Sequence, residues 1–245
     1  MKTKILSLML LLSVFIFSYD YKELLVGDTK GNIYVQDNIY EVRPLASMTK
    51  VMTILLTLDK VNAKEISLDD NVTISYTASK VPYGVKMNAG ETFTVEELLK
   101  ATAIRSSNNA AYALAEYVSH GDVYDFVDKM NEEARNLGAT GTHFVNPHGL
   151  QNEDHYTTAY DLYLMFNACL QNPQFVEMIS QTSYTANLTS ASGVPYTMTW
   201  EPTNYYASGD AAAPEGVKVI GGKTGTTDEA GSCLVLYEQE TTPSS

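Results

Sequence analysis

The sequence predicts an α+β fold, and three features support this. Near the N-terminus, residues 22–38 alternate apolar and polar side chains around the turn "DTKGN", which is typical of a β-hairpin. The middle of the chain shows helical spacing, and two strand-like segments, 217–227 and 231–237, follow it. Strands before and after a helical region indicate an α+β chain whose terminal strands share one sheet against a buried helix.

The chain is long enough to form a substantial core. It has 245 residues, of which 44% are hydrophobic, so one large domain or two closely packed subdomains are expected. The net charge of −13 argues against nucleic-acid binding, which requires clustered Lys and Arg. Two cysteines, Cys169 and Cys233, are too few for a disulfide-stapled scaffold, and we expect two separate buried thiols.

Residues 1–18, "MKTKILSLMLLLSVFIFS", predict an export signal peptide. Lys2 and Lys4 give a positive start, and an apolar run follows over residues 5–17. That run is short for a membrane span, although an uncleaved N-terminal anchor stays an alternative. We therefore expect an exported chain whose folded part is residues 19–245.

The first helix is expected to follow the stretch "PLASMTKVMT" (residues 44–53). Its apolar residues, which include Val51, Met52 and Leu58, lie on nearly every side of the helix, as in a helix buried within a domain. Ser47 is placed at or near the N-terminus of this helix, where backbone N–H groups lack intrahelical partners.

The later elements follow from local signals. Residues 70–95 are expected to be strand and loop, and Thr94 with Glu97 forms a capping box that begins a helix over 94–104. After a polar break at "RSSNN", helical spacing resumes. The remaining predictions, in chain order, are helices over 110–120 and 122–139, a polar loop over 140–157, a helix over 158–172 and a β-hairpin over 182–200.

Ser47 and Lys50 form the first candidate for chemistry. A serine hydroxyl that attacks a carbonyl needs an adjacent base and a site for the oxyanion. Residues i and i+3 share a helix face, so Lys50 can reach Ser47, and a buried helix would lower the pKa of the lysine. An S-x-x-K pattern alone arises by chance about once in a chain of this length, and its ordinary interpretation is a surface lysine.

Two further motifs provide possible partners. In "SSNNAA" (106–111), Ser106 and Asn108 could cap the next helix or could present a hydroxyl and an amide to a cleft. In "GGKTGTT" (221–227), glycines on a strand would let a second backbone approach, and Lys223 and Thr224 could bind a carboxylate. The structural alternative for the second motif is a simple turn.

The three motifs together are more specific than any one of them. S-x-x-K on a buried helix, S-x-N between helices and K-T-G on a late strand are the signature of penicillin-binding proteins and class A β-lactamases. The chain resembles the low-molecular-weight penicillin-binding proteins, and within them the serine-type D-alanyl-D-alanine carboxypeptidases. The resemblance runs from about residue 22 to about residue 237 and rests on "ASMTKVMT", "THFVNPHGL", "HYTTAYDL" and "GGKTGTTDEAGSCLV".

This resemblance implies a fold and an activity. The fold would be that of β-lactamases and penicillin-binding proteins, with an antiparallel sheet flanked by helices and a helical subdomain. The activity would be removal of the terminal D-alanine from peptidoglycan stem peptides through an acyl-enzyme on Ser47, with β-lactams as inhibitors. The resemblance implies no cofactor or metal and an extracytoplasmic location in the cell envelope.

It also implies roles for individual residues. Ser47 would be the nucleophile, Lys50 the general base and Ser106 a proton relay to the leaving group. The oxyanion would be held by the backbone N–H groups of Ser47 and Thr226. The residues implied to bind substrate are Asn108, Lys223, Thr224, Gly225 and Thr226.

Three other functions are weighed against this one. A class A-like β-lactamase would need a glutamate base for deacylation, and the region before the last helices has no E-x-x-x-N pattern, while "NPHGL" favours the peptidase. A non-catalytic peptidoglycan-binding protein on the same scaffold is the second alternative. A zinc site formed by His143, His148 and His155 is disfavoured because the loop has no H-E-x-x-H motif.

The C-terminal end departs from the family pattern. Family members continue after the "CLVLY" strand, so we expect a last strand and a C-terminal helix to be missing. Apolar surface around Val235 should then be exposed. Membrane attachment is expected only through an uncleaved signal or through a C-terminal anchor that this sequence lacks.

Overall fold

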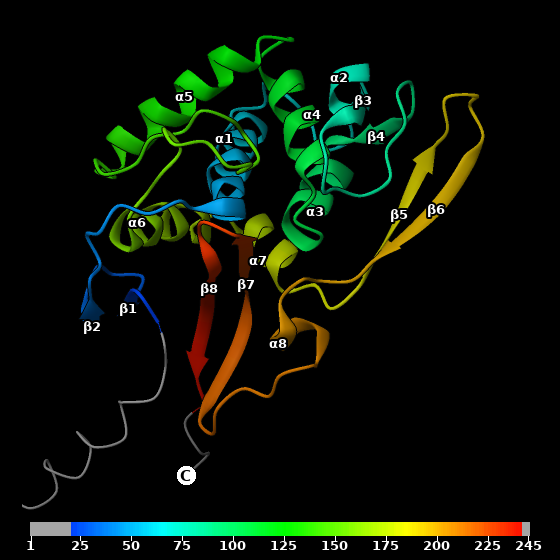
Figure 1. Cartoon of the computed structure of the whole chain (residues 1–245). Helices are drawn as coiled ribbons and strands as arrows, with labels where there is room; N and C mark the ends of the chain where they lie inside the picture. The colour runs from blue at the N-terminus through cyan, green and yellow to red at the C-terminus, as the bar shows by residue number, and fades with distance from the viewer. Residues whose placement is uncertain (1–20, 242–245) are drawn as a thin grey trace, which may run out of the picture.

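A computed structural model describes residues 21–241 of the chain (Figure 1). The predicted signal peptide, residues 1–18, lies outside the described residues. Within 21–241, no helix combines the length and apolar character needed to cross a bilayer.

Helices form the largest layer of the fold and gather around one central helix, α1. The helical segments, in chain order, are the 3₁₀ turn Ala46–Thr49, α1 (Lys50–Asn62), α2 (Tyr76–Lys80), α3 (Val95–Ile104), α4 (Asn108–Val118), α5 (Val123–Asn136), α6 (Ala159–Leu170), α7 (Pro173–Ile179) and α8 (Tyr205–Ser208).

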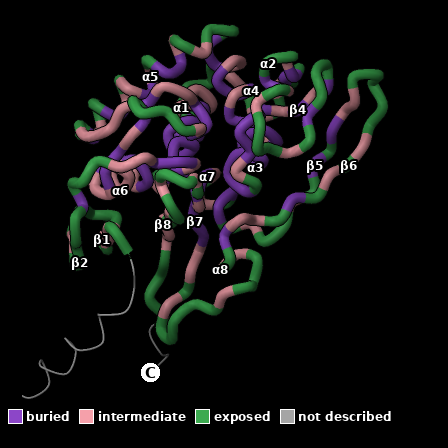
Figure 2. Tube along the Cα trace, in the orientation of Figure 1, coloured by how far each residue is buried: buried purple, intermediate pink, exposed green. Residues whose placement is uncertain are grey.

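Helix α1 is buried because it is apolar on nearly every side, as its sequence predicts. Val51, Met52 and Leu58 have no exposed surface, and α1 contacts α3, α4, α5 and α6. Figure 2 shows this burial along the helix. The predicted capping box is also confirmed, since the Thr94 side chain accepts from the Glu97 backbone and the Glu97 carboxylate accepts from the Thr94 backbone.

Eight strands form three antiparallel sheets within the described residues. Their bounds are β1 (Leu24–Gly27), β2 (Ile33–Asp37), β3 (Asn71–Thr73), β4 (Thr92–Thr94), β5 (Tyr184–Thr189), β6 (Pro195–Trp200), β7 (Val217–Thr227) and β8 (Gly231–Glu240). β1 pairs with β2, β3 to β6 form a four-stranded sheet in chain order, and β7 pairs with β8. In Figure 1 the β1–β2 and β7–β8 hairpins both lie below the helices, and β5–β6 projects to one side.

The α+β class is confirmed, but the prediction that the terminal strands share one sheet is wrong. The β1–β2 and β7–β8 hairpins are separate two-stranded sheets, because no backbone ladder joins them within residues 21–241. Each hairpin forms through pairing of neighbouring segments, which local sequence predicts well. Pairing between the two hairpins is a long-range property that local patterns do not specify.

Several element boundaries also differ from the sequence prediction. Residues 70–95 contain the short helix α2, and neither α7 nor α8 is predicted. The polar break between α3 and α4 spans only Arg105–Ser107, because Ser107 already caps α4 by accepting from the Ala110 N–H. Strand β8 continues to Glu240, where Glu238 and Glu240 pair with Val219 and Val217.

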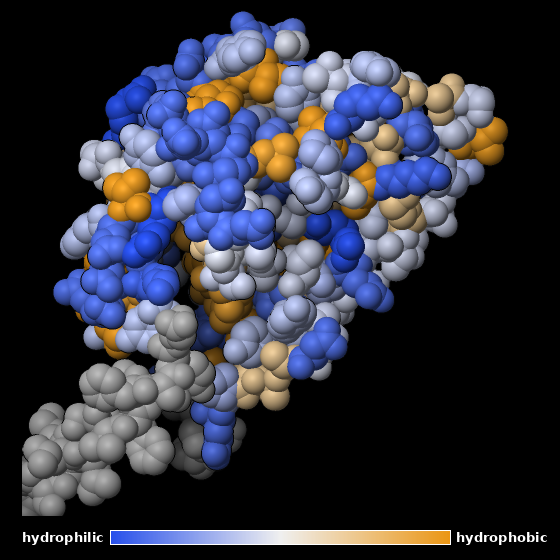
Figure 3. All heavy atoms as spheres, viewed as in Figure 1, coloured by the Kyte–Doolittle hydropathy of each residue, from blue (hydrophilic) through white to orange (hydrophobic). Residues whose placement is uncertain are grey.

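The C-terminal hairpin carries exposed apolar surface beside Val235, as expected. Val235 is partly buried and packs against the core, whereas its neighbour Leu234 is 53% exposed. Figure 3 shows a largely hydrophilic face on which hydrophobic residues gather in a few patches, one of them in a central hollow. The two cysteines are unpaired, as predicted, but only Cys169 is fully buried and Cys233 is partly buried.

Truncating a core residue of α1 should destabilise the whole fold. Leu58→Ala removes a side chain with no exposed surface, so the free energy of unfolding should fall by about 2–5 kcal/mol. Leu234→Ala, at an exposed position, should change it by less than about 0.5 kcal/mol. Denaturant unfolding monitored by circular dichroism measures both, and equal losses would contradict the assignment of α1 as the centre of the core.

Candidate active site

Ser47 lies on the 3₁₀ turn that leads into α1, as the sequence predicts. Ala46, just before it, has a positive φ of 46°, which is an uncommon conformation for a residue with a side chain. Gly149 packs directly on this turn, since a Cβ at that position would lie 1.9 Å from the Ala46 carbonyl oxygen. The "NPHGL" loop therefore packs against the backbone just before Ser47, and only glycine fits at the contact.

A buried hydrogen-bond chain holds the same turn from the other side. Thr49 Oγ1 donates to the Ala46 carbonyl at 2.7 Å and lies 2.7 Å from His155 Nε2. The Val145 N–H donates to His155 Nδ1 at 3.0 Å, so the proton of the neutral imidazole is on Nε2 and is donated to Thr49. Burial is the main cause that lowers the pKa of His155 to about 4. The sequence did not predict these hydrogen bonds, because His155 lies 106 residues from Thr49.

Lys50 is completely buried beside Ser47. Its Nζ lies 2.9 Å from Ser47 Oγ, 2.6 Å from Asn108 Oδ1 and 2.5 Å from the His148 carbonyl oxygen. Burial, followed by repulsion from the charge of Lys223, holds the pKa of Lys50 well below its usual value of 10.5. The structure thus places the predicted pair in contact, and it adds the His148 carbonyl, which sequence analysis did not identify.

Ser106 and Lys223 form a second serine–lysine pair. Lys223 Nζ donates to Ser106 Oγ at 2.7 Å and to the Thr224 carbonyl at 2.6 Å. Lys223 is 1% exposed, and burial lowers its pKa to about 7. Ser106 has a φ of 55°, a strained conformation for serine. Of the two interpretations of the polar break, capping applies to Ser107, which caps α4. Ser106 does not cap the helix and faces Lys223.

Asn108 connects the two halves of the site. Its Oδ1 accepts from Lys50, and its Nδ2 donates to the Pro82 carbonyl at 2.9 Å. The side chain is nearly buried, at 5% exposure. Asn108 therefore bridges Lys50 and the backbone at Pro82.

The K-T-G motif lies within β7, so the alternative interpretation as a turn is wrong. Thr224 Oγ1 lies 2.6 Å from Thr203 Oγ1. A Cβ on Gly225 would lie 3.0 Å from the backbone nitrogen of Ser47, which shows how closely β7 approaches the turn that carries Ser47. Thr226, one residue farther along β7, is exposed. The three motifs, far apart in sequence, therefore meet at one place.

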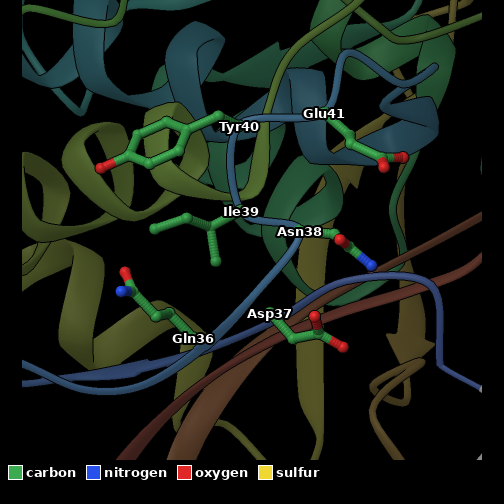
Figure 4. Close-up of a pocket in the computed structure, with 6 residues that line it drawn as sticks. All are labelled: Gln36, Asp37, Asn38, Ile39, Tyr40 and Glu41. Carbon is green, nitrogen blue, oxygen red and sulfur yellow. The ribbon is translucent and has the colours of Figure 1, made fainter.

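The three loop histidines have separate environments. His155 contacts Thr49, His143 Nδ1 lies 2.5 Å from the Asp154 carbonyl oxygen, and His148 stacks with Tyr112. Over residues 21–241, no three His, Cys, Asp or Glu side chains gather in a group suited to a metal ion. A hollow of about 470 Å³ lies elsewhere, at the end of β2 (Figure 4), and contains none of the predicted site residues. It is lined by Gln36, Asp37, Asn38, Ile39, Tyr40 and Glu41.

Comparison with known families agrees with this geometry. The model of the D-alanyl-D-alanine carboxypeptidase peptidase family matches residues 21–242. The chain belongs to this family. Among curated members, it is 39% identical over 148 residues to the D-alanyl-D-alanine carboxypeptidase DacF of Bacillus subtilis, and 34% identical over 205 residues to the D-alanyl-D-alanine carboxypeptidase of Streptomyces sp. strain K15.

Solved structures of the family share the fold. The Streptomyces K15 DD-transpeptidase superposes with a TM-score of 0.78 at 31% identity, covering 86% of this chain and 82% of that one. The D-alanyl-D-alanine carboxypeptidase DacD of Francisella tularensis gives the same TM-score at 25% identity. The match covers 89% of this chain and 62% of DacD. The predicted fold of the penicillin-binding proteins is thus confirmed.

The chain spans part of the length of several relatives. Its match to DacF covers 60% of this chain and 38% of DacF. Its match to the Streptomyces enzyme covers 79% of this chain and 67% of that enzyme. The comparisons therefore establish the family and the fold of the chain.

The buried histidine should make folding stability depend on pH. The unfolded imidazole takes up a proton near pH 6.5, whereas in the folded chain the pKa of His155 is about 4, so acid favours the unfolded state. The free energy of unfolding should fall by about 3 kcal/mol from this group as the pH drops from 6.5 to 4. His155→Gln should reduce the slope and leave the part due to His148, whose burial lowers its pKa to about 3. Urea unfolding across this pH range measures it.

The exposed His120 changed to Gln provides the control for loss of an imidazole. Its pH dependence should match that of the unmodified chain. An unchanged slope in His155→Gln would contradict the assignment of His155 as the buried neutral donor to Thr49.

Proposed function

We propose that this chain is a serine-type D-alanyl-D-alanine carboxypeptidase that removes the terminal D-alanine of peptidoglycan stem peptides through an acyl-enzyme on Ser47. The observation that carries the proposal is the fully buried Lys50 in contact with Ser47. Within residues 21–241, neither Lys50 nor Lys223 forms an ion pair with a carboxylate. A buried amine without a counter-charge favours its neutral form, which is the form that acts as a base.

The contacts of Lys50 suit a general base. A neutral amine has two N–H donors and one lone pair. The two N–H groups are used by Asn108 Oδ1 and the His148 carbonyl, which leaves the lone pair to accept the proton of the Ser47 hydroxyl at 2.9 Å. Proton transfer to Lys50 would activate Ser47 for attack on the carbonyl of the penultimate D-alanine.

Ser106 and Lys223 suit the protonation of the leaving group. Ser106 Oγ, which accepts a hydrogen bond from Lys223, would pass its proton to the nitrogen of the departing D-alanine. It would then recover a proton from the Lys223 ammonium. The lowered pKa of Lys223, about 7, lets this lysine exchange a proton near neutral pH. The strained backbone at Ser106 points to a conformation set by the site and not by local preference.

Strand β7 is suited to hold the substrate. In this proposal the peptide lies along β7, Asn108 binds its amide, and Thr224 takes its terminal carboxylate, with Lys223 and Gly225 shaping the same edge. The backbone N–H groups of Ser47 and Thr226 would stabilise the oxyanion. The close approach of Gly225 to the backbone nitrogen of Ser47 supports this arrangement, and loss of one oxyanion donor typically raises a barrier by about 2.7–4 kcal/mol.

The proposal extends to inhibitors, location and domain limits. β-Lactams would acylate Ser47 in place of the peptide. The substrate is part of the cell wall, so we infer that residues 1–18 direct export and that residues 19–245 act as the catalytic domain outside the cytoplasm. Any membrane attachment would come from an uncleaved signal or from a C-terminal anchor.

Labelling with a fluorescent penicillin tests the proposed nucleophile. The chain should form a stable adduct located on Ser47 by mass spectrometry, and it should release D-alanine from an N-acylated peptide ending in D-Ala-D-Ala. Ser47→Ala should abolish the adduct and lower D-alanine release by roughly a thousandfold or more. Rapid loss of the label would favour a β-lactamase, and a folded chain without any adduct would favour a non-catalytic binding protein.

The pH dependence of acylation tests the role of the second lysine. Acylation of Ser47 should rise with pH as Lys50 loses its proton. Lys223→Gln removes the charge that helps to lower the pKa of Lys50, so the midpoint of the rate profile should move to higher pH. Lys129→Gln, an exposed lysine paired with Asp125, should leave the midpoint unchanged, and an unmoved midpoint in Lys223→Gln would contradict the coupling.

A further inference from the structure

A groove of about 630 Å³ lies along the end of β6. One wall is formed by residues 198–201 and the other by residues 83–86, with Arg105 also in the lining. None of the predicted site residues lines this groove, so the proposed catalytic function leaves it without a role.

Strand β6 presents its edge to the groove. Successive side chains of a strand point to opposite faces, so three consecutive lining residues of β6, 198–200, indicate that the strand lies edge-on. Strand β5, the partner of β6, contributes no lining residue. The four-stranded sheet runs in the order β3-β4-β5-β6, so within residues 21–241 the outer edge of β6 pairs with no other strand. The backbone groups of such an edge are a template for an added strand.

The opposite wall of the groove is held in place by α4 and its cap. The Val85 N–H donates to Ser107 Oγ at 3.2 Å, and Asn109 Nδ2 donates to the Val85 carbonyl at 2.7 Å. Tyr83, in the same wall, is 82% exposed and has a φ of 60°, an uncommon conformation for a bulky residue. The wall thus presents an exposed aromatic ring on an anchored backbone, and a groove formed in advance lowers the entropic cost of binding.

Two cations and a buried N–H group set the chemistry of the groove. Arg105 and Lys86 are exposed, against the single carboxylate of Glu201. Within residues 21–241 neither cation forms an ion pair, and Arg105 donates to the Glu201 carbonyl at 3.1 Å. The indole Nε1 of Trp200 is buried and has no hydrogen-bond partner among the same residues. A local positive excess on a chain of net charge −13 attracts anions, and the indole N–H favours a ligand with acceptor groups.

We propose that the groove binds an extended, acidic segment of a partner protein, which adds a strand to the outer edge of β6. Backbone hydrogen bonds to β6 provide affinity, and acidic side chains of the segment pair with Arg105 and Lys86. A second copy of this chain does not fit as a partner through the same strand. Residues 195–200, "PYTMTW", contain no acidic residue, so the cations of the two copies would face each other unmatched.

The fluorescence of Trp200 measures this binding directly, because it is the single tryptophan of the chain and lines the groove. The probe is the L-peptide Thr-Val-Glu-Val-Glu-Val-Thr, acetylated at its N-terminus and amidated at its C-terminus. Its counterpart has Lys in place of both Glu residues. The acidic peptide should shift the Trp200 emission saturably, with a Kd lower than that of the lysine peptide by roughly tenfold or more. No saturable shift up to roughly 1 mM, or equal Kd values, would overturn the proposal.

Arg105→Gln and Lys86→Gln test the two cations at exposed positions, where the fold should tolerate the change. Each variant should weaken binding of the acidic peptide by roughly two- to fivefold. Arg135→Gln is the matched control, because it makes the same change in charge at an exposed position of α5 that does not line the groove. Its Kd should equal that of the unmodified chain, and unchanged Kd values in both groove variants would contradict the proposal.

Methylation of the peptide backbone separates strand addition from simple charge attraction. Alternate residues of an antiparallel strand exchange hydrogen bonds with a given neighbour, so peptides N-methylated at odd or at even positions should bind differently. One of them should lose roughly tenfold in affinity and the other should stay within about twofold. Amide hydrogen exchange at residues 195–200 should slow when the unmethylated peptide binds, while residues 33–37 of β2 should be unaffected. Equal binding of the two methylated peptides, or unchanged exchange in β6, would overturn strand addition.

Competition with a substrate peptide distinguishes a partner site from an extension of the catalytic site. The Kd of the acidic peptide is measured on Ser47→Ala with and without an excess of an N-acylated peptide that ends in D-Ala-D-Ala. An unchanged Kd is expected, and this result does not depend on whether the unmodified chain releases D-alanine. A Kd that rises with the substrate peptide would assign the groove to the catalytic site and overturn the proposal.

Discussion

The structure depends on the burial of two lysine side chains that pair with no carboxylate among residues 21–241. A charged amine in an apolar interior is costly, and losing the proton relieves that cost. Lys50 and Lys223 are both almost fully enclosed, and each lies within hydrogen-bond distance of a serine hydroxyl. Enclosure therefore favours the neutral form of both amines, each of which lies beside a serine hydroxyl.

The position of Lys50 is fixed by segments that are far apart in the chain. Helix α1 carries it, α4 supplies the Asn108 amide, and the "NPHGL" loop supplies the His148 carbonyl. In the proposed function these contacts take both N–H groups of a neutral amine, which would direct its lone pair at Ser47. A packed helix and a tightly fitted loop hold such geometry better than exposed loops do.

The turn that carries Ser47 is held from three sides. Gly149 packs on the Ala46 carbonyl, the His155–Thr49 chain binds the same carbonyl, and Gly225 of β7 lies against the Ser47 backbone. The Gly149 contact excludes any side chain, and a Cβ at Gly225 would make a tight contact with the Ser47 backbone, which gives a physical reason for glycine in "NPHGL" and favours it in "KTG". The positive φ of Ala46 is a strain that these contacts offset.

The sequence by itself determined the features that depend on neighbouring residues. It predicted the β1–β2 hairpin, the buried helix α1, the Thr94 capping box and the reach of Lys50 to Ser47, because each follows from fixed spacing in a strand, turn or helix. The motif order also identified the family. It did not predict that the terminal hairpins form separate sheets, since strand pairing across the chain is not encoded in local alternation.

Only the tertiary structure decided which distant residues meet. Lys50 contacts Asn108 across 58 positions, Thr49 contacts His155 across 106, and Lys223 contacts Ser106 across 117. The environments that lower the pKa values of both lysines likewise arise from burial, which no single segment can provide. The physical reason is that local geometry is set by the few residues of a turn, whereas these contacts and the exclusion of water require the whole core to be packed.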